Sequence, residues 1–234
     1  MLLKDRFRPI TDTAGLFQRS ASDCATDYVS WMQPVVSGSG SSLQANVLPA
    51  GGLETHLERL EPLARAVTTK VLFAPAPAGW TACFTNDWRG SDMSSIVPML
   101  SLRLGCSALR VTCTPDLGKG QSRRYGARIV QAHRANLSPY RSIAVANDGG
   151  RWVDERFGEP LPSEDPSWFT ADRKRDRFTA AQLRELVSHF VPSFWDADLW
   201  PTEPAFLVER VGVLPPAYSS VTRLDVQRDL PTDC

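Results

Sequence analysis

The sequence has no run of apolar residues long enough to cross a membrane. Every apolar stretch is shorter than the roughly 18 residues that a spanning helix requires. The first residues, Met1-Leu2-Leu3-Lys4, meet a charge almost at once and lack the apolar core of a secretory signal peptide. We therefore expect a soluble protein that resides in the cytoplasm, where its thiols stay reduced.

The sequence also has few groups that bind metals or cofactors. Its three histidines are far apart, and none of its five cysteines forms a Cys-x-x-Cys pair. It contains no dinucleotide fingerprint, P-loop, nucleophile elbow or His-Glu-x-x-His motif. These absences exclude only the named families, because many active sites assemble from scattered residues. We predict no catalytic residue, no metal and no cofactor. Cys83, Cys106 and Cys113 lie in or beside apolar runs, which favours buried, inert thiols.

Charge of either sign is not in excess. Twenty-six basic and 26 acidic side chains cancel, so no bulk charge attracts the chain to nucleic acid or anionic lipid. The distribution is uneven, however. Residues 118–177 hold twelve basic and eight acidic side chains, whereas residues 178–234 hold four basic and eight acidic ones. The acidic end either neutralises the basic stretch within the fold, which we favour, or serves as an interface.

Local patterns predict a mixture of helices and strands. Thr179 and Gln182 fit a capping box at the start of an amphipathic helix. Gly105 follows an apolar helical stripe at a position suited to a left-handed cap. From residue 106 the period changes to that of strands, and Asn147-Asp148-Gly149-Gly150 predicts a hairpin turn.

These elements predict an α+β fold. Consecutive strands over 106–157 favour antiparallel pairing, without a regular β-α-β alternation. We expect one α+β domain at 22–212, with a mainly antiparallel central sheet and helices packed mostly on one face. Residues 1–21 are predicted to be an N-terminal surface segment, and residues 213–234 a C-terminal tail on the surface.

Three places combine tryptophan with charge and are candidates for partner binding. Trp88 lies between Asp87 and Arg89 in a loop between a strand and a helix. Arg151 precedes a tryptophan at the end of the hairpin. Aromatic and acidic residues alternate near the C-terminus and suit a basic protein surface; they include Trp195, Asp196, Asp198 and Trp200. In each place the tryptophan has a structural alternative, which is to pin its segment onto the core.

Two further sets of charged residues are candidates for binding a ligand. Six cations and no acid lie between Lys119 and Asn147, and Arg123, Arg124 and Arg128 are our candidates for binding an anion. Asp172 and Asp176 are four residues apart, which on a helix would allow them to bind a cation. Surrounding arginines and lysine make i,i+4 salt bridges on a solvated face the favoured interpretation of this pair.

The sequence therefore favours a non-catalytic cytoplasmic protein-binding module. An immunity or antitoxin type of protein, which blocks the active site of a basic toxin or enzyme, is one concrete form. The first alternative is a hydrolase or transferase that acts on a phosphate-bearing small molecule. The second alternative is a nucleic-acid-binding protein.

Overall fold

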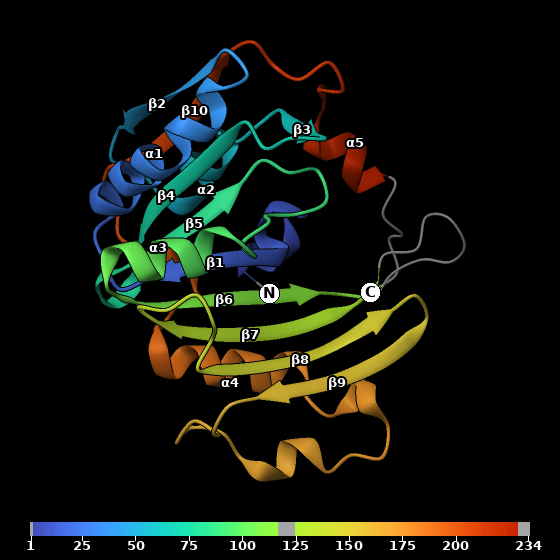
Figure 1. The fold of residues 1–234 in the computed structure, drawn as a ribbon. Coiled ribbons are helices and arrows are strands. Elements are labelled where there is room, and N and C mark those ends of the chain that lie inside the picture. Colours follow the sequence, from blue (N-terminus) through green and yellow to red (C-terminus); the bar gives the residue numbers. More distant parts are fainter. Residues whose placement is uncertain (1, 117–124, 229–234) are drawn as a thin grey trace.

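The computed structural model of this chain describes residues 2–116 and 125–228. Its centre is a nine-stranded sheet in the order β2-β10-β4-β5-β1-β6-β7-β8-β9, in which all neighbours are antiparallel (Figure 1). The strands are β1 (Thr13–Phe17), β2 (Ser41–Leu48), β4 (Lys70–Ala76), β5 (Trp80–Thr85), β6 (Ser107–Thr114), β7 (Ala127–Arg134), β8 (Arg141–Asp148), β9 (Arg151–Phe157) and β10 (Ala205–Gly212). A separate two-stranded sheet pairs β3 (Leu63–Arg65) with β11 (Ser219–Val221).

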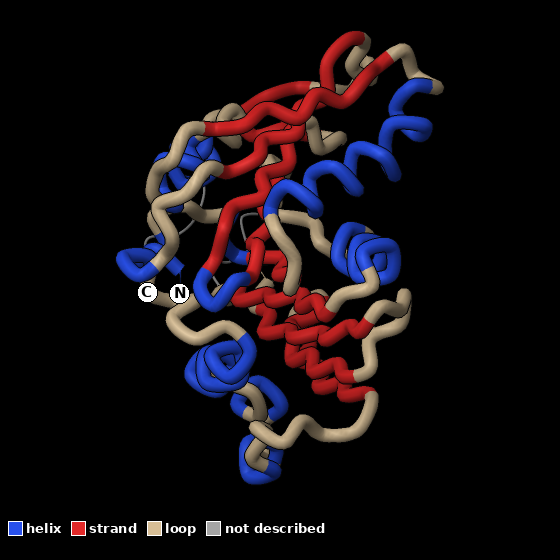
Figure 2. The backbone as a smooth tube through the Cα atoms, turned by 90° about the vertical axis from the view of Figure 1, so that its left-hand side faces the viewer, coloured by secondary structure: helices blue, strands red, loops and turns tan. Residues whose placement is uncertain are grey.

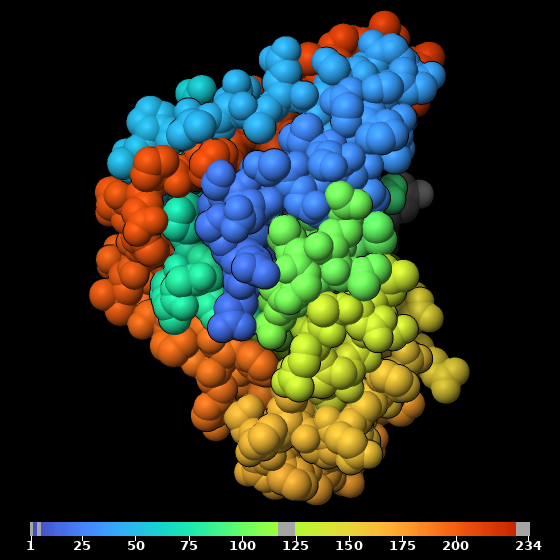
Figure 3. Space-filling model, turned by 60° about the vertical axis from the view of Figure 1, so that its left-hand side comes forward, coloured from blue at the N-terminus to red at the C-terminus, as the bar shows by residue number. Residues whose placement is uncertain are grey.

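Helices cover both faces of the large sheet (Figure 2). The longer ones are α1 (Ala21–Ser37), α2 (Leu53–Glu58), α3 (Ile96–Leu104), α4 (Ala180–Phe190) and α5 (Arg223–Arg228). Helices α1 and α3 lie side by side on one face, where an ion pair of 2.8 Å joins Arg103 to Asp27 (Figure 3). Helices α2 and α4 pack on the opposite face. Each face therefore has its own apolar cluster.

The expected single α+β domain with a mainly antiparallel central sheet is confirmed. The helices are divided between the two faces more evenly than expected. The reason is visible in the strands at the centre, which are apolar on both sides. In β4, Val71 and Phe73 contact the cluster under α1, and Leu72 and Ala74 contact the other cluster. No helix in the described part of the chain is long and apolar enough to span a membrane.

The N-terminal residues do not form a surface segment, contrary to the prediction. Strand β1 lies in the middle of the sheet between β5 and β6, and all five of its residues are buried. Before it, Leu2, Phe7 and Ile10 are buried in the core. A strand that is covered on both faces has no alternation of polar and apolar residues. This is why the pattern of residues 1–21 carried no strand signal.

The C-terminal region also differs from a plain surface tail. Strand β11 pairs with β3, and Val226 of α5 is 8% exposed within the main apolar cluster. The short helices that matter for the sites below are η5 (Pro166–Phe169), η6 (Lys174–Asp176) and η7 (Ala197–Leu199).

Elements with strong local signals occur where predicted. The capping box of Thr179 and Gln182 starts α4, and Gly105 ends α3 in the left-handed conformation with φ 60°. The β8–β9 turn consists of Gly149 and Gly150, whose φ angles are 61° and 106°. Positive φ at both central residues is the property of a type I′ turn. Trp152 pairs with Asn147, two residues from Val145 on the same face.

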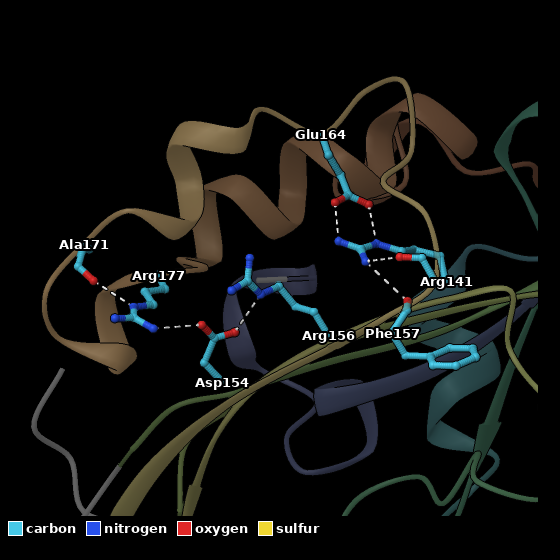
Figure 4. Close-up of polar contacts among 8 residues, drawn as sticks. Arg141, Asp154, Arg156, Phe157, Glu164, Ala171 and Arg177 are labelled. Atoms are coloured by element: carbon cyan, nitrogen blue, oxygen red, sulfur yellow. Dashed lines mark hydrogen bonds and ion pairs between the residues drawn. The ribbon is translucent and has the colours of Figure 1, made fainter.

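The two faces of β8 and β9 differ in cover. On one face, the segment 158–178 lies against the strands, and two ion pairs, Arg141–Glu164 and Arg177–Asp154, attach the segment (Figure 4). On the face toward the viewer in Figure 1, no helix of the described residues stands in front of β8 and β9. Side chains there are half-buried or exposed, and Phe157 is 62% exposed.

Candidate functional site

The loop after β5 holds Trp88 between two guanidinium groups. The guanidinium carbons of Arg65 and Arg89 lie 4.9 and 5.2 Å from the centre of the Trp88 ring, within cation–π distance. The Trp88 amide donates to the carbonyl of Ala64 at 3.1 Å, which ties the loop to β3. Asp87 accepts a bond from the Arg89 amide at 2.7 Å, and burial raises the pKa of its carboxyl. Trp88 is thus a half-buried, fixed side chain that also packs on the core.

Arg151 is exposed at the first position of β9, opposite Asp148. The structure does not bring it to the Trp88 loop. Strand β9 is five places from β5 in the sheet order. At about 4.8 Å per strand spacing, the two strands are about 24 Å apart. These candidate residues therefore belong to separate surfaces.

The connection between α4 and β10 is pinned to the core by its two tryptophans. Trp200 is 6% exposed, and its indole N–H donates to the carbonyl of Phe194 at 2.9 Å. The half-buried Trp195 donates to the carbonyl of Arg184 in α4 at 3.2 Å. Trp200 therefore attaches its segment to the core, which is the structural alternative given above, because a side chain in the core is not available to a partner. Trp195 keeps one part accessible at the surface.

Acidic residues in the same connection remain exposed. Asp196 caps η7 and accepts a bond from the Asp198 amide at 3.3 Å. Asp196, Asp198 and Glu203 are exposed, and Leu199 among them is 60% exposed. None of the three carboxylates forms an ion pair with another described residue. These three carboxylates therefore form no ion pair with the described part of the basic stretch, and neutralisation by the whole acidic end stays a prediction. We call Asp196, Asp198, Leu199 and Glu203 the 196–203 surface.

Of the three predicted anion-binding residues, Arg123 and Arg124 lie outside the described residues. Arg128 is in β7, where its Nε donates to the carbonyl of Phe178 at 2.7 Å and its Nη2 donates to the carbonyl of Arg175. Its guanidinium carbon lies 4.7 Å from the centre of the Trp152 ring. Burial lowers the pKa of this guanidinium group. Arg128 is held in a single orientation by these contacts.

Arg128 opens onto a cleft of about 430 Å³. The ends of β6 and β7, the helix η6 and the first turn of α4 form its walls. Its lining residues are Cys113, Thr114, Pro115, Arg128, Arg175, Asp176, Thr179, Ala180 and Arg184. We call this the basic cleft. The sequence alone does not identify Arg175 and Arg184 as site residues. The only signal for Arg175 is the cationic run at 173–175, which favours a solvated face.

The carboxylates considered for cation binding are not arranged for it. Helix η6 comprises only Lys174–Asp176, so Asp172 and Asp176 do not share a helical face. Both are exposed, and Asp176 pairs with Arg175 at 3.6 Å. Within residues 2–116 and 125–228, no group of three or more His, Cys, Asp or Glu side chains is placed to hold a metal ion.

The four described cysteines are buried and free, as expected for Cys83, Cys106 and Cys113. Burial is the main cause that raises the pKa of each thiol, including that of Cys24. A thiol with a raised pKa forms little of the nucleophilic thiolate. The described cysteines therefore act as core residues.

A second cleft lies between α1, β4 and β10 and is mainly apolar. It has a volume of about 190 Å³, and Tyr28, Trp31 and Arg210 are among its lining residues. Arg210 donates to the hydroxyls of Ser41 and Ser39 at 3.0 and 2.6 Å, so its polar groups are engaged within the protein. The volume is below the roughly 300 Å³ at which small-molecule pockets begin. The basic cleft exceeds that size.

Comparison of this chain with protein-family models, with curated proteins and with solved structures finds no match.

Proposed function

We propose that this protein is a non-catalytic protein-binding module whose 196–203 surface contacts a basic partner protein. One observation carries the proposal: three exposed carboxylates and an exposed leucine lie in one short connection, residues 196–203, and none of the carboxylates is paired with a cation of the described chain. An exposed apolar residue close in the chain to like charges is typical of an interface, where the apolar contact supplies affinity and the charges supply orientation.

Rigidity of the supporting segment favours the same function. The bonds of Trp195 and Trp200 to backbone carbonyls fix the connection that carries η7, at 3.2 and 2.9 Å. The rings of Phe194 and Trp200 lie 5.5 Å apart beneath it. A surface that is ordered before binding loses less conformational entropy on association. The module thus presents its carboxylates in a preformed arrangement.

A concrete form of this module is a cytoplasmic immunity or antitoxin type of protein that covers the active site of a basic toxin or enzyme. Nucleic-acid-degrading and other anion-binding enzymes carry positive active sites, to which an acidic surface is complementary. The Trp88 loop and Arg151, about 24 Å apart by strand spacing, would contact such a partner only at separate places.

The test is affinity purification of the tagged protein from its native cells, with quantification of each co-purified protein. The double variant Asp196→Lys/Asp198→Lys reverses two charges of the 196–203 surface. The matched control, Glu58→Lys/Glu159→Lys, reverses two exposed carboxylates elsewhere. We expect one basic protein to bind the wild type and the control with equal affinity, and the double variant at least tenfold more weakly, which is about 1.4 kcal/mol.

Two results would contradict the proposal. One is a partner that binds the double variant and the wild type equally, since the interface would then lie elsewhere. The other is the absence of any stoichiometric partner in cells that express the protein. For the immunity form, growth of cells that express the recovered partner should depend on co-expression of the wild type, and the double variant should fail to protect them.

A further inference from the structure

The basic cleft brings together three arginines that are far apart in the sequence. Arg128 comes from β7, Arg175 from η6 and Arg184 from α4. In Figure 1, α4 lies behind the strands. Helix η6 lies by the start of β9, where Trp152 shares a hollow with it, so the cleft is on the face that carries α4. The convergence depends on the tertiary fold, because 47 residues separate the first two arginines.

The lining carries more positive than negative charge. Three guanidinium groups face one carboxylate, that of Asp176, so the sum is +2. Asp176 lies 3.6 Å from Arg175. Neither Arg128 nor Arg184 forms an ion pair with a carboxylate of the described residues. Like charges in one cleft destabilise the protein unless an anion neutralises them, so the arrangement indicates an anionic ligand.

Arg128 has the properties of a preorganised anion-binding group. Two backbone carbonyls and the Trp152 ring fix its guanidinium plane, as described above. Its bonds occupy Nε and Nη2, and no described residue accepts a bond from Nη1, which is thus available to a ligand as far as the described residues go. A fixed, planar guanidinium group can form paired hydrogen bonds to phosphoryl oxygens, which adds specificity to charge.

A shallower hollow adjoins the basic cleft and provides an aromatic surface. It is lined by Trp152, Arg173, Lys174 and Arg175, and its volume is about 340 Å³. Arg175 lines both hollows, so the two are neighbours. A flat ring stacked on an aromatic side chain gains about 1–3 kcal/mol in nucleotide complexes. Phosphate groups and an aromatic ring on one ligand would use both hollows together.

We propose that the basic cleft binds the phosphate groups of a small nucleotide whose base lies in the adjoining hollow against Trp152. The site uses residues other than those of the 196–203 surface, although the Arg184 carbonyl also accepts the bond from Trp195. The charges and the cleft volume carry the phosphate assignment, and the Trp152 hollow carries the nucleotide assignment.

The experiment is isothermal titration of the full chain with ADP and, separately, with pyrophosphate, at physiological ionic strength. The double variant Arg175→Gln/Arg184→Gln removes two exposed cations of the cleft. Arg59→Gln is the control, because Arg59 is an exposed arginine outside both hollows. We expect ADP to bind more tightly than pyrophosphate, the double variant to lose at least tenfold in ADP affinity, and the control to stay within twofold of the wild type.

Each other outcome overturns the proposal. If neither compound binds at millimolar concentration, the cleft is not an anion site. If Arg59→Gln weakens binding as much as the double variant does, the attraction comes from overall charge. If pyrophosphate binds as tightly as ADP, the hollow does not hold a base. If a single-stranded oligonucleotide binds much more tightly than ADP, the cleft belongs to a nucleic-acid surface instead. Unchanged circular dichroism of the variants confirms that they are folded.

Discussion

Arg141 of β8 and Glu164 form a buried, bidentate ion pair that attaches the segment 158–178 to the sheet (Figure 4). Their two contacts are 2.7 and 2.5 Å, and the side chains are 5% and 1% exposed. The remaining nitrogen of Arg141 donates to the carbonyl of Gly158 at 2.8 Å. Glu164 also accepts a bond from the Leu161 amide at 3.0 Å. One buried carboxylate thus orders both the start of the segment and the strand beneath it.

Removal of this carboxylate is expected to destabilise the protein strongly. Glu164→Ala leaves the guanidinium group of Arg141 buried without its counter-charge, and loss of one partner of such a pair costs about 3–5 kcal/mol. Urea unfolding measures the loss. The control is Asp27→Ala, which removes the partner of Arg103 in a more exposed pair and should cost far less stability, because solvent screens that pair. The double variant Arg141→Met/Glu164→Leu should recover most of the stability, because it removes both charges. Equal losses in Glu164→Ala and Asp27→Ala would contradict this account.

Gly158 is required at the point where the chain leaves β9. Its φ is +81°, and a Cβ atom there would lie 1.9 Å from the carbonyl oxygen of Tyr140. Gly158→Ala is therefore expected to lower the free energy of unfolding by at least about 2 kcal/mol, because left-handed strain and a backbone clash add together. In Gly38→Ala, the new Cβ would lie 3.8 Å from its nearest atom at a helical φ of −60°. That control should change stability by about 0.5 kcal/mol or less. A similar effect of both substitutions on the urea midpoint would show that the clash is relieved.

The parts of the fold that the sequence predicted are those with local causes. A capping box at Thr179, a left-handed glycine at 105 and a two-glycine turn between β8 and β9 depend on a few neighbouring residues. Strand β1 carried no such signal, because burial on both faces removes the alternation. The pairing of β2 with β10 joins Leu48 to Ala205, and no local pattern predicts a contact across that distance in the chain.

The same limit applies to the candidate sites. Arg128 was identified from a stretch without acids, which is a property of the sequence alone. Arg175 and Arg184 were not, because their approach to Arg128 requires η6 and α4 to pack on the same face of the sheet. The sequence also does not predict that Asp196 is exposed and Trp200 is buried, because both residues occur in one irregular connection that has no periodic pattern. Tertiary packing, which sequence periodicity does not report, decides which of them meets solvent.

His133 is expected to make stability depend on pH. It is 3% exposed in β7, where it pairs with Ala108 of β6, and its Nδ1–H donates to the carbonyl of Asn136 at 3.2 Å. Burial lowers the pKa of its imidazole, the bond to Asn136 opposes this, and the charge of Arg110 lowers the pKa further. The folded state therefore binds the proton less readily than the unfolded chain, in which the pKa is about 6.5. The contribution of His133 is present above that value and is lost as the pH falls through the folded pKa.

Urea unfolding of the wild type and of His133→Gln between pH 5 and pH 8 tests this dependence. Carboxylates also titrate toward acid, but they are common to both proteins and cancel in the difference between the two free energies. The wild type should lose stability relative to His133→Gln as the pH falls below about 6.5, because its unfolded state alone gains a proton at residue 133. His189→Gln is the control, since His189 is exposed in the last turn of α4. A difference between the wild type and His133→Gln that is constant over this range would mean that the imidazole binds protons equally in the folded and unfolded states.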